Sequence, residues 1–343
     1  MTGNALLTLG LVGLDTALLV WGLRVLPREH MQILAAIPLR RRDDGLWAGI
    51  NLTWYGVLQA VAVVSGIACA LLLAGAAAVP GTTVAVTLGC VLAAGLPAAK
   101  LVARLVERRP GTFTVGGAVL VAVLIVPWVA LGVDAWRGGD HALPTVAALA
   151  VAYPFGEGIG RLACISFGCC YGRRLADCGP LLRALFGRCP AVIVGPTRKA
   201  AYAGHCVGEP LLPVPALSAL VLSAAGSASV PIFLAGCFRT AAALSLGVAF
   251  AWRFASEFLR ADYRGGGRLS AYQWMALVCL TYALAAVALL PRSDRVPAAD
   301  LGLALLASPI AMTALAVMGL TVFVYLGVSR MTTATIRLQV RDR

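Results

Sequence analysis

The feature that most constrains this chain is a series of apolar stretches, each long enough to cross a bilayer. An α-helix of about 20 apolar residues spans the hydrocarbon core of a membrane and satisfies its own backbone hydrogen bonds there. Only 13% of the residues are charged, whereas a soluble domain carries roughly a quarter. The sequence therefore predicts an all-α, polytopic transmembrane helix bundle. The nine expected spans are roughly 4–23, 51–79, 84–105, 112–133, 142–168, 213–235, 238–259, 271–291 and 303–327.

The spans and the loops between them divide the chain into five parts. We expect a seven-helix membrane core in two parts, residues 51–172 and 211–291, separated by a small capping domain at 173–210 that is rich in Arg, Gly and Pro. Residues 1–50 are expected to add an N-terminal transmembrane helix and an interfacial arm. Residues 292–343 are expected to add a C-terminal transmembrane helix and a basic tail. The sixth span is the least regular, because the sequence "GSAS" interrupts it.

The basic residues are distributed unevenly between the two faces of this predicted bundle. Of the 28 Lys and Arg residues, 22 fall in the loops and tail of one face, here called the basic face, and four fall on the other. The positive-inside rule predicts that the basic face is cytoplasmic, unless some of these charges bind headgroups or substrate instead. The net charge of +13 indicates attraction to anionic lipid, and no nucleic-acid motif is present. The basic face comprises 24–50, 100–110, 173–210, 260–270 and the tail after 328.

Cysteines also gather on the basic face, which holds six of the ten. Thiols stay reduced in the cytoplasm, whereas the opposite orientation would favour disulfides within 178–206. No two matching C-x-x-C pairs occur, and His30 and His205 are the only histidines on this face. We therefore expect no metal ion and no cofactor. The six cysteines are Cys164, Cys169, Cys170, Cys178, Cys189 and Cys206.

Charged side chains lie inside two of the predicted spans. Glu157 and Arg161 are four residues apart on one helical face, and Arg253, Glu257 and Arg260 follow one face of another span. Each such charge costs about 3 kcal/mol on insertion scales, so it indicates a function by default. A guanidinium offers a fork of donors that matches phosphate oxygens, which predicts a phospholipid-headgroup site. The alternative is that these pairs only bind helices together.

Glycines surround the predicted charge cluster. Gly156 and Gly160 form a G-x-x-x-G pair, which lets another helix backbone approach. Gly116 and Gly117 open the fourth span, and Gly172 follows the double cysteine. Backbone N–H groups at a helix end can hold an anion, although plain packing explains each of these glycines equally well.

Four segments in this order resemble the prolipoprotein diacylglyceryl transferase family. They are "LTWYG", "TVGG", "GRLACISFGCCYG" and "WRFASEFLRADYRGGGRLSAYQW", and they span residues 50–291, which leaves the first and last spans as additions. The "GCCYG" form is similar to a divergent branch. The resemblance implies transfer of a diacylglyceryl group from phosphatidylglycerol to the thiol of a lipobox cysteine in a precursor protein, with release of glycerol phosphate.

Site roles follow from the same resemblance. Arg161 and Arg253 would hold the departing phosphate, and Glu257 would orient Arg253 or the glycerol end. Fixed donors that spread the developing charge are what such a leaving group needs. The residues expected to line the site are Tyr55, Gly116, Gly117, Glu157, Gly172 and Arg260.

The chain departs from the family at three positions. Val115 stands where the family has a histidine, Cys164 replaces an asparagine, and Cys169 replaces an acidic residue. A base must then come from elsewhere. Cys170 and His205 are the candidates for a thiol or base in the chemistry, and Glu157, Glu257 and Asp262 are the other candidate bases near the cluster. Packing is the alternative role for the cysteines.

These departures leave other functions open. The family's active site faces away from the cytoplasm, whereas charge counting places the matching face inside. A non-catalytic protein that binds or moves phospholipid is one alternative. A related transferase with a different, cytoplasmic acceptor is another.

Overall fold

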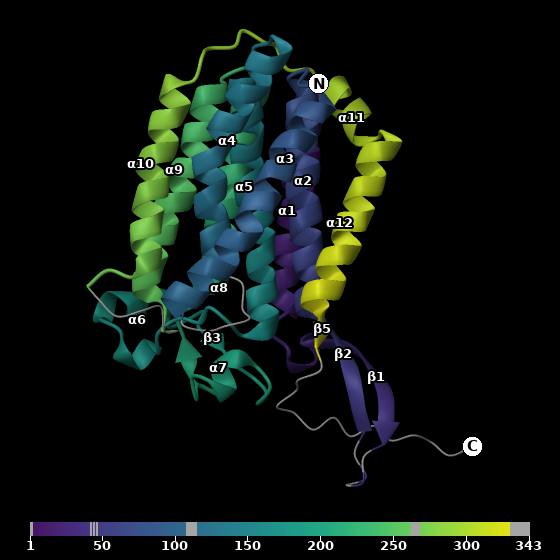
Figure 1. The fold of residues 1–343 in the computed structure, drawn as a ribbon. Helices are drawn as coiled ribbons and strands as arrows, with labels where there is room; N and C mark the ends of the chain where they lie inside the picture. The colour runs from purple at the N-terminus through teal and green to yellow at the C-terminus, as the bar shows by residue number, and fades with distance from the viewer. Residues whose placement is uncertain are drawn as a thin grey trace.

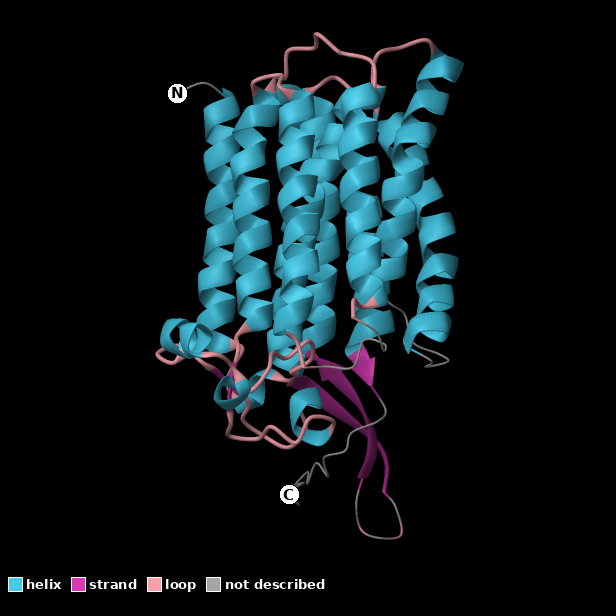
Figure 2. Cartoon of the chain, turned by 90° about the vertical axis from the view of Figure 1, so that its left-hand side faces the viewer, coloured by secondary structure: helices cyan, strands magenta, loops and turns pink. Residues whose placement is uncertain are grey.

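The computed structural model describes residues 3–41, 43, 45, 47–107, 115–261 and 268–329. Within these ranges, nine helices are long and apolar enough to cross a membrane, and they stand side by side in one bundle (Figures 1 and 2). The predicted all-α bundle with nine spans is confirmed. The spanning helices are α1 (Gly3–Val25), α2 (Trp54–Ala76), α3 (Gly81–Val102), α4 (Val115–Arg137), α5 (Ala142–Phe167), α8 (Val214–Leu234), α9 (Phe238–Ser256), α10 (Ala271–Leu289) and α12 (Pro309–Gly327).

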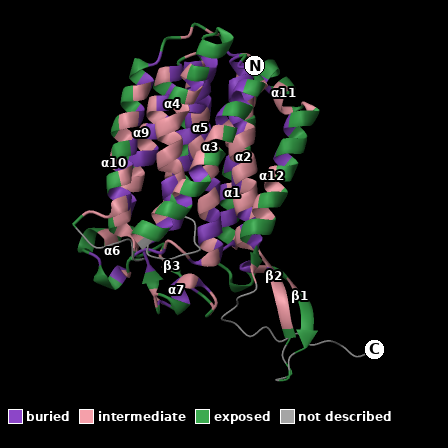
Figure 3. Ribbon diagram, viewed as in Figure 1, coloured by how far each residue is buried: buried purple, intermediate pink, exposed green. Residues whose placement is uncertain are grey.

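Helix α5 is the centre of the bundle. About 78% of its span is buried inside the protein, against 17% for α1 and for α12, and Figure 3 shows α12 at the edge of the bundle. It packs against α2, α8 and α9. A helix enclosed on all sides can carry polar groups at membrane depth, because neighbouring helices shield them from lipid.

Small residues bring α2 and α5 close together. A Cβ atom on Gly66 would lie 3.4 Å from the Cα of Gly156, so the two backbones nearly touch. One turn further on, the Gln59 amide donates to the Gly160 carbonyl at 3.3 Å. The predicted role of the G-x-x-x-G pair in helix approach is therefore confirmed.

The second span begins later than predicted, at Trp54, because the residues before it form a β-hairpin. Strand β1 (Ile33–Arg41) pairs antiparallel with β2 (Trp47–Thr53), and β5 (Val328–Ser329) adds to the other edge of β2. The Thr53 side chain then accepts from the Gly56 N–H and caps α2. The arm expected within residues 1–50 is thus part of a small sheet. It hangs from the end of the bundle at which α12 ends (Figure 1).

The last span also begins later than predicted, at Pro309. A separate short helix, α11 (Ala299–Leu306), precedes it. The Ser308 side chain accepts from the Ala311 N–H at 3.3 Å, and Pro309 occupies the first turn. A serine cap followed by proline starts a new helix and does not continue an old one.

The "GSAS" segment does not break α8. The Ser229 hydroxyl donates to the Ala225 carbonyl at 2.8 Å, so its polar group is satisfied within the helix. A second serine on α8, Ser223, donates to the carboxylate of Asp15 on α1 at 3.2 Å. Serines in this span therefore serve its own backbone and its contact with α1.

Residues 173–210 form small elements at the end of the bundle here called the cap end (Figure 2). Arg198 ties them to the spans: its guanidinium donates to the carbonyls of Leu26 (3.0 Å), Arg28 (2.7 Å) and Ile165 (3.2 Å). Burial lowers the pKa of Arg198, which still lies far above neutrality as a guanidinium. The elements are η3 (Leu175–Asp177), α6 (Pro180–Phe186), β3 (Ala191–Val192), α7 (Lys199–Tyr202) and β4 (Pro210–Leu211).

The described parts of the basic face lie together at the cap end, as the predicted topology requires. The turn between α8 and α9 lies at the opposite end (Figure 1). The basic tail from residue 330 and the loop segments 108–114 and 262–267 lie outside the described residues.

Close glycine contacts also hold the C-terminal helices on α2, and this generates a stability prediction. A Cβ atom at Gly302 of α11 would lie 2.2 Å from the Leu72 carbonyl oxygen. We expect Gly302→Ala to lower stability by about 1–3 kcal/mol, as overpacking does, with a lower Tm in detergent. Gly132→Ala is the control, since no described atom lies within 4 Å of a Cβ there. A Tm for Gly302→Ala as high as that of the control would contradict this packing.

The anchor made by Arg198 gives a second prediction. Arg198→Met keeps an apolar stem and leaves three carbonyls, of Leu26, Arg28 and Ile165, without their donor, at a cost of about 2 kcal/mol or more. We expect faster amide hydrogen exchange in α7, with the exchange of α5 unchanged. The control is Arg188→Met, because Arg188 is exposed on the same cap. Equal exchange of α7 in the two variants would show that Arg198 does not hold the cap.

Candidate functional site

One carboxylate at the cap end of α5 binds two arginines from different helices. Arg161, one turn along α5, and Arg253, on α9, both donate to the same oxygen of Glu157, the second at 2.9 Å. The Tyr153 hydroxyl donates to the other carboxylate oxygen. Tyr153, Glu157 and Arg161 are spaced four residues apart, so they share one face of α5. The predicted approach of Arg161 to Arg253 is therefore found in the structure.

Glu257 does not pair with Arg253, which was one of its two predicted roles, and orienting the glycerol end stays a prediction. Helix α9 ends at Ser256, and η4 (Glu257–Leu259) is a tighter 3₁₀ turn, in which residues three apart lie above one another. Glu257 consequently pairs with Arg260, at 3.7 Å, and accepts from the Ser270 hydroxyl at 3.5 Å. The carboxylate bound to Arg253 is Glu157, not Glu257.

These side chains carry a net positive charge. Arg260 lies within electrostatic range of Arg161, so the cluster contains three guanidinium groups and two carboxylates. We call these five residues the arginine cluster. Arg161 and Arg253 are 17% and 13% exposed, whereas Arg260 is 5% exposed. An anion arriving from outside would therefore meet Arg161 and Arg253 first.

Arg161 has donor capacity that the described residues do not use. Its Nε is buried and has no hydrogen-bond partner in the part of the chain that the structure describes. Its Nη1 faces the Cys170 sulfur at 4.0 Å, a weak acceptor. A buried donor left unpaired is costly, so Arg161 is suited to an additional anionic ligand.

The two glycines that open α4 have different surroundings. A Cβ atom on Gly116 would lie 2.6 Å from the ring of Tyr272 and 3.2 Å from Nη2 of Arg253. The absence of a side chain at this position therefore leaves space for the Tyr272 ring and the Arg253 guanidinium. A Cβ atom on Gly117 would instead meet the Ala98 carbonyl oxygen of α3 at 2.8 Å. Gly116 thus lies against the arginine cluster, and Gly117 packs α4 against α3.

Gly172 joins the end of α5 to the end of α9. It forms an antiparallel bridge with Arg260, next to the hydrogen bond from the Arg173 N–H to the Leu259 carbonyl at 2.9 Å. A Cβ atom on Gly172 would lie 2.4 Å from the Leu212 carbonyl oxygen. The role of Gly172 in the structure is a close backbone approach that fixes the segment carrying Arg260.

Three cysteines converge where α5 ends. Gly168 has φ of 70°, and the left-handed turn returns Cys169 and Cys170 to Cys164, with all three sulfurs within 4.8 Å of one another. Hydrogen bonds to Cys164 and Cys170, with burial, hold the pKa of Cys169 well above its usual range. None of the ten cysteines, all of which the structure describes, forms a disulfide.

Tyr55 and His205 occupy different places. The Tyr55 ring lies against Phe167, with centroids 5.4 Å apart, and interacts electrostatically with Arg161 and the three thiols. His205 is exposed in the cap, where its carbonyl accepts from Arg174 at 3.4 Å. Among the described residues, no hydrogen bond or ion pair joins its ring to the arginine cluster.

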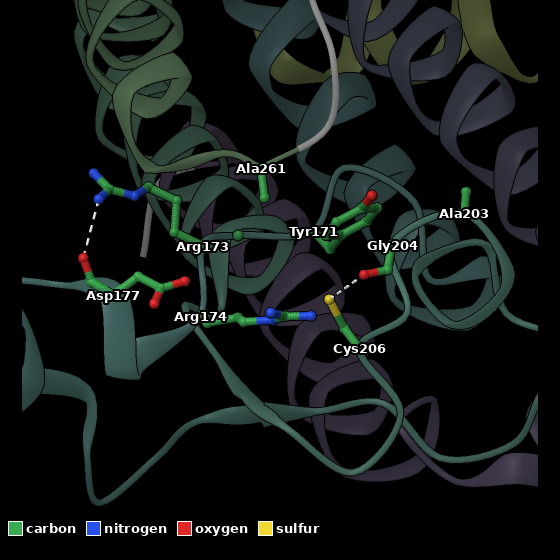
Figure 4. A pocket seen from close by; sticks show the side chains of 9 residues that line it. Tyr171, Arg173, Arg174, Asp177, Ala203, Gly204, Cys206 and Ala261 are labelled. Carbon is green, nitrogen blue, oxygen red and sulfur yellow. Dashed lines mark hydrogen bonds between the residues drawn. The ribbon is translucent and has the colours of Figure 1, made fainter.

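A pocket of about 470 Å³ opens in the cap beside Gly172 (Figure 4). Arg173 donates to the Asp177 carbonyl at 3.1 Å, and the Cys206 thiol donates to the Gly204 carbonyl at 2.9 Å. The pocket thus adjoins the strand pairing that positions Arg260. Its lining is Tyr171, Gly172, Arg173, Arg174, Asp177, Ala203, Gly204, Cys206 and Ala261.

Sequence reasoning missed two aromatic residues of the site. Tyr153 precedes Glu157 by four residues, so the i, i+4 spacing that pointed to Arg161 also pointed to it. Tyr272, which is buried against Gly116, lies in the quoted "SAYQW" segment. Both positions could have been selected from the sequence.

Fold and site together define a polytopic helical membrane protein with a positively charged arginine cluster buried at the cap end of its spans. No protein-family model and no curated protein matches this chain. The resemblance to the diacylglyceryl transferases therefore rests on the motifs alone.

Proposed function

We propose that this protein is a membrane-embedded lipid-group transferase, resembling prolipoprotein diacylglyceryl transferase. Its donor is phosphatidylglycerol, an anionic phospholipid, and its acceptor is a thiol. The observation that carries the proposal is the Glu157 carboxylate shared by Arg161 and Arg253 at the end of two spans. In this reading, the protein resides in the bacterial inner membrane and acts on a lipobox-containing precursor protein.

The charge of the cluster supports an anionic donor. Among these five residues, guanidinium groups outnumber carboxylates three to two, and Arg161 and Arg253 share a single carboxylate, that of Glu157. The phosphodiester of phosphatidylglycerol carries one negative charge, which would add to that of Glu157 beside the two arginines. The unpaired Nε of Arg161 supplies a donor, and guanidinium geometry matches two phosphate oxygens at once.

The proposed reaction requires the same two arginines to stabilise the phosphate as it leaves. The acceptor sulfur attacks the glyceryl CH₂ carbon that is bonded to the phosphate oxygen, so a C–S bond forms as the C–O bond breaks. The electron pair of the C–O bond leaves with oxygen as glycerol phosphate, which gains a second negative charge. Arg161 and Arg253 would stabilise that charge as it develops. The acceptor's thiol proton must go to a base.

The base is the open part of this mechanism. Val115 stands at the family's histidine position and is 62% exposed at the first residue of α4, next to Gly116. Cys170 lies 4.0 Å from Arg161, and His205 lies in the cap. Of these two candidates, Cys170 has the contact with the arginine cluster.

The arginines generate a direct prediction about activity. We expect Arg253→Lys and Arg161→Lys each to reduce diacylglyceryl transfer by about 100-fold or more, because lysine keeps the charge but loses the two-pronged geometry. The assay measures thioether-linked lipid on a lipobox peptide and released glycerol phosphate. Arg239→Lys is the control, since Arg239 lies at the opposite end of α9, where it donates to the Leu290 carbonyl. Normal turnover by Arg253→Lys would show that the site is not a phosphate clamp.

A non-catalytic, phospholipid-binding protein is the second candidate, and Val115 favours it. The same assay separates the two, because a binding protein retains phosphatidylglycerol without releasing glycerol phosphate. Transfer by Val115→His but not by the wild type would identify a transferase that has lost its base. If both bind the lipid and neither uses the peptide, a different acceptor, such as a cytoplasmic thiol or alcohol, becomes the better proposal.

Membrane orientation decides which acceptors can reach the site. Cys189 is exposed in the cap, and Cys237 is exposed in the turn at the opposite end of the bundle. The positive-inside rule predicts that a membrane-impermeant maleimide labels Cys237 in intact cells and Cys189 only after permeabilisation. Peptide mass spectrometry of the wild-type protein measures both sites at once. The reverse pattern would place the cap outside the cytoplasm, where the family's lipobox acceptors are processed.

A further inference from the structure

The three-cysteine cluster is built by a backbone turn that the chain adopts at a cost. Gly168 and Cys170 both have positive φ, 70° and 56°. This region is disfavoured for a residue with a side chain, so Cys170 is held there by its surroundings. The result is that Cys169 and Cys170 both reach the sulfur of Cys164, one turn back on α5.

The sulfur positions match those of metal ligands. With Zn–S bonds of about 2.3 Å, tetrahedral geometry puts two sulfur ligands about 3.8 Å apart. The Cys164 and Cys170 sulfurs are 3.8 Å apart, and all three lie within 4.8 Å of one another. Closing the triangle around an ion needs only small side-chain movements.

The local charge also suits a thiolate site. Three thiolates around a divalent cation carry one negative charge, and the Arg161 Nη1, 4.0 Å from the Cys170 sulfur, supplies a positive one. Thiols are soft ligands that prefer ions such as Zn²⁺, Cd²⁺ or Cu⁺ over Mg²⁺ or Ca²⁺. The expectation of no metal rested on the absence of paired C-x-x-C motifs, which a left-handed turn makes unnecessary.

We propose that Cys164, Cys169 and Cys170 bind one thiophilic divalent cation, Zn²⁺ or its analogue Cd²⁺, through three thiolates. Binding releases the three thiol protons, so that one M²⁺ and three thiols give one anionic M(S)₃ centre and three H⁺. Three protein ligands leave a fourth position open, as in catalytic zinc sites.

If the protein is the proposed transferase, the open fourth position of the metal is where the acceptor thiol would bind. The metal would lower the pKa of an acceptor thiol bound there, beside the Arg161 that holds the phosphate, so that the thiol gives its proton to water as the sulfur binds. The thiolate would then attack the glyceryl carbon, so that the C–S bond forms as the C–O bond to phosphate breaks. Water would thus take the proton for which Val115 offers no base.

Anaerobic titration of the reduced, full-length protein in detergent with Cd²⁺ tests the site, with thiolate-to-metal charge-transfer absorbance as the readout. We expect one equivalent to bind, and Cys164→Ser, Cys169→Ser and Cys170→Ser each to weaken binding by about 100-fold or more, since even outer-shell changes cost 10–100-fold. Cys178→Ser and Cys206→Ser are the controls, because both are buried cap cysteines. Equal binding in the two sets would overturn the proposal.

A second measurement needs no variant and so does not depend on folding. Zn²⁺ should protect Cys164, Cys169 and Cys170 of the wild-type protein from alkylation, as mapped by peptide mass spectrometry, while Cys189 stays reactive. Unprotected thiols would overturn the site. A disulfide between two of the three, with no metal bound, would also overturn it and assign the cluster to redox chemistry.

The transfer assay separates this site from the proposed function. Transfer that is lost on chelation and restored by Zn²⁺ would support thiol activation. Metal binding with no transfer under any condition would keep the site and reject the transferase. Transfer that is unaffected in a metal-free Cys170→Ser protein would keep the transferase and reject the metal's part in it.

Discussion

The rest of the structure depends on one carboxylate, that of Glu157, whose negative charge offsets part of the positive charge of two guanidinium groups at membrane depth. Because a lone charge there costs about 3 kcal/mol, Arg161 and Arg253 can sit at the ends of α5 and α9 only if those ends meet. Gly116 leaves room for Arg253, and Gly156 lets α2 pack against the neighbouring face of α5. Electrostatics thus dictate helix position, and small residues make that position sterically accessible.

Backbone contacts then connect this cluster to the cap and to the thiols. The bridge between Gly172 and Arg260 joins the ends of α5 and α9, and the turn containing Cys170 lies between that bridge and Arg161. In the proposals made above, the phosphate of the donor and the sulfur of the acceptor would have neighbouring subsites whose groups come within 4.0 Å. An attack of sulfur on a carbon next to phosphate requires this kind of proximity.

The features that could be predicted from the sequence are those that depend on composition, and the features that were missed depend on local backbone geometry. The nine spans and the arginines inside them stand out because apolar length and buried charge are properties of the residues themselves. The partner of Glu257 depends on a change to a 3₁₀ turn after Ser256, and the thiol cluster depends on the left-handed turn at Gly168. Strand β1 is exposed at most of its positions, so its side chains do not alternate between buried and exposed, which is the pattern that predicts a strand from sequence.

Asn4 imposes an order on the biogenesis of this protein. Its amide donates to the carbonyl of Pro297 at 2.9 Å, 293 residues away, and accepts from the Ala299 N–H at 2.9 Å. Helix α1 therefore completes its polar contacts only after α11 has been synthesised. A chain that stalls before residue 297 would keep the contact of Asn4 with the Leu234 carbonyl at 3.3 Å and would lack both contacts with the C-terminal segment.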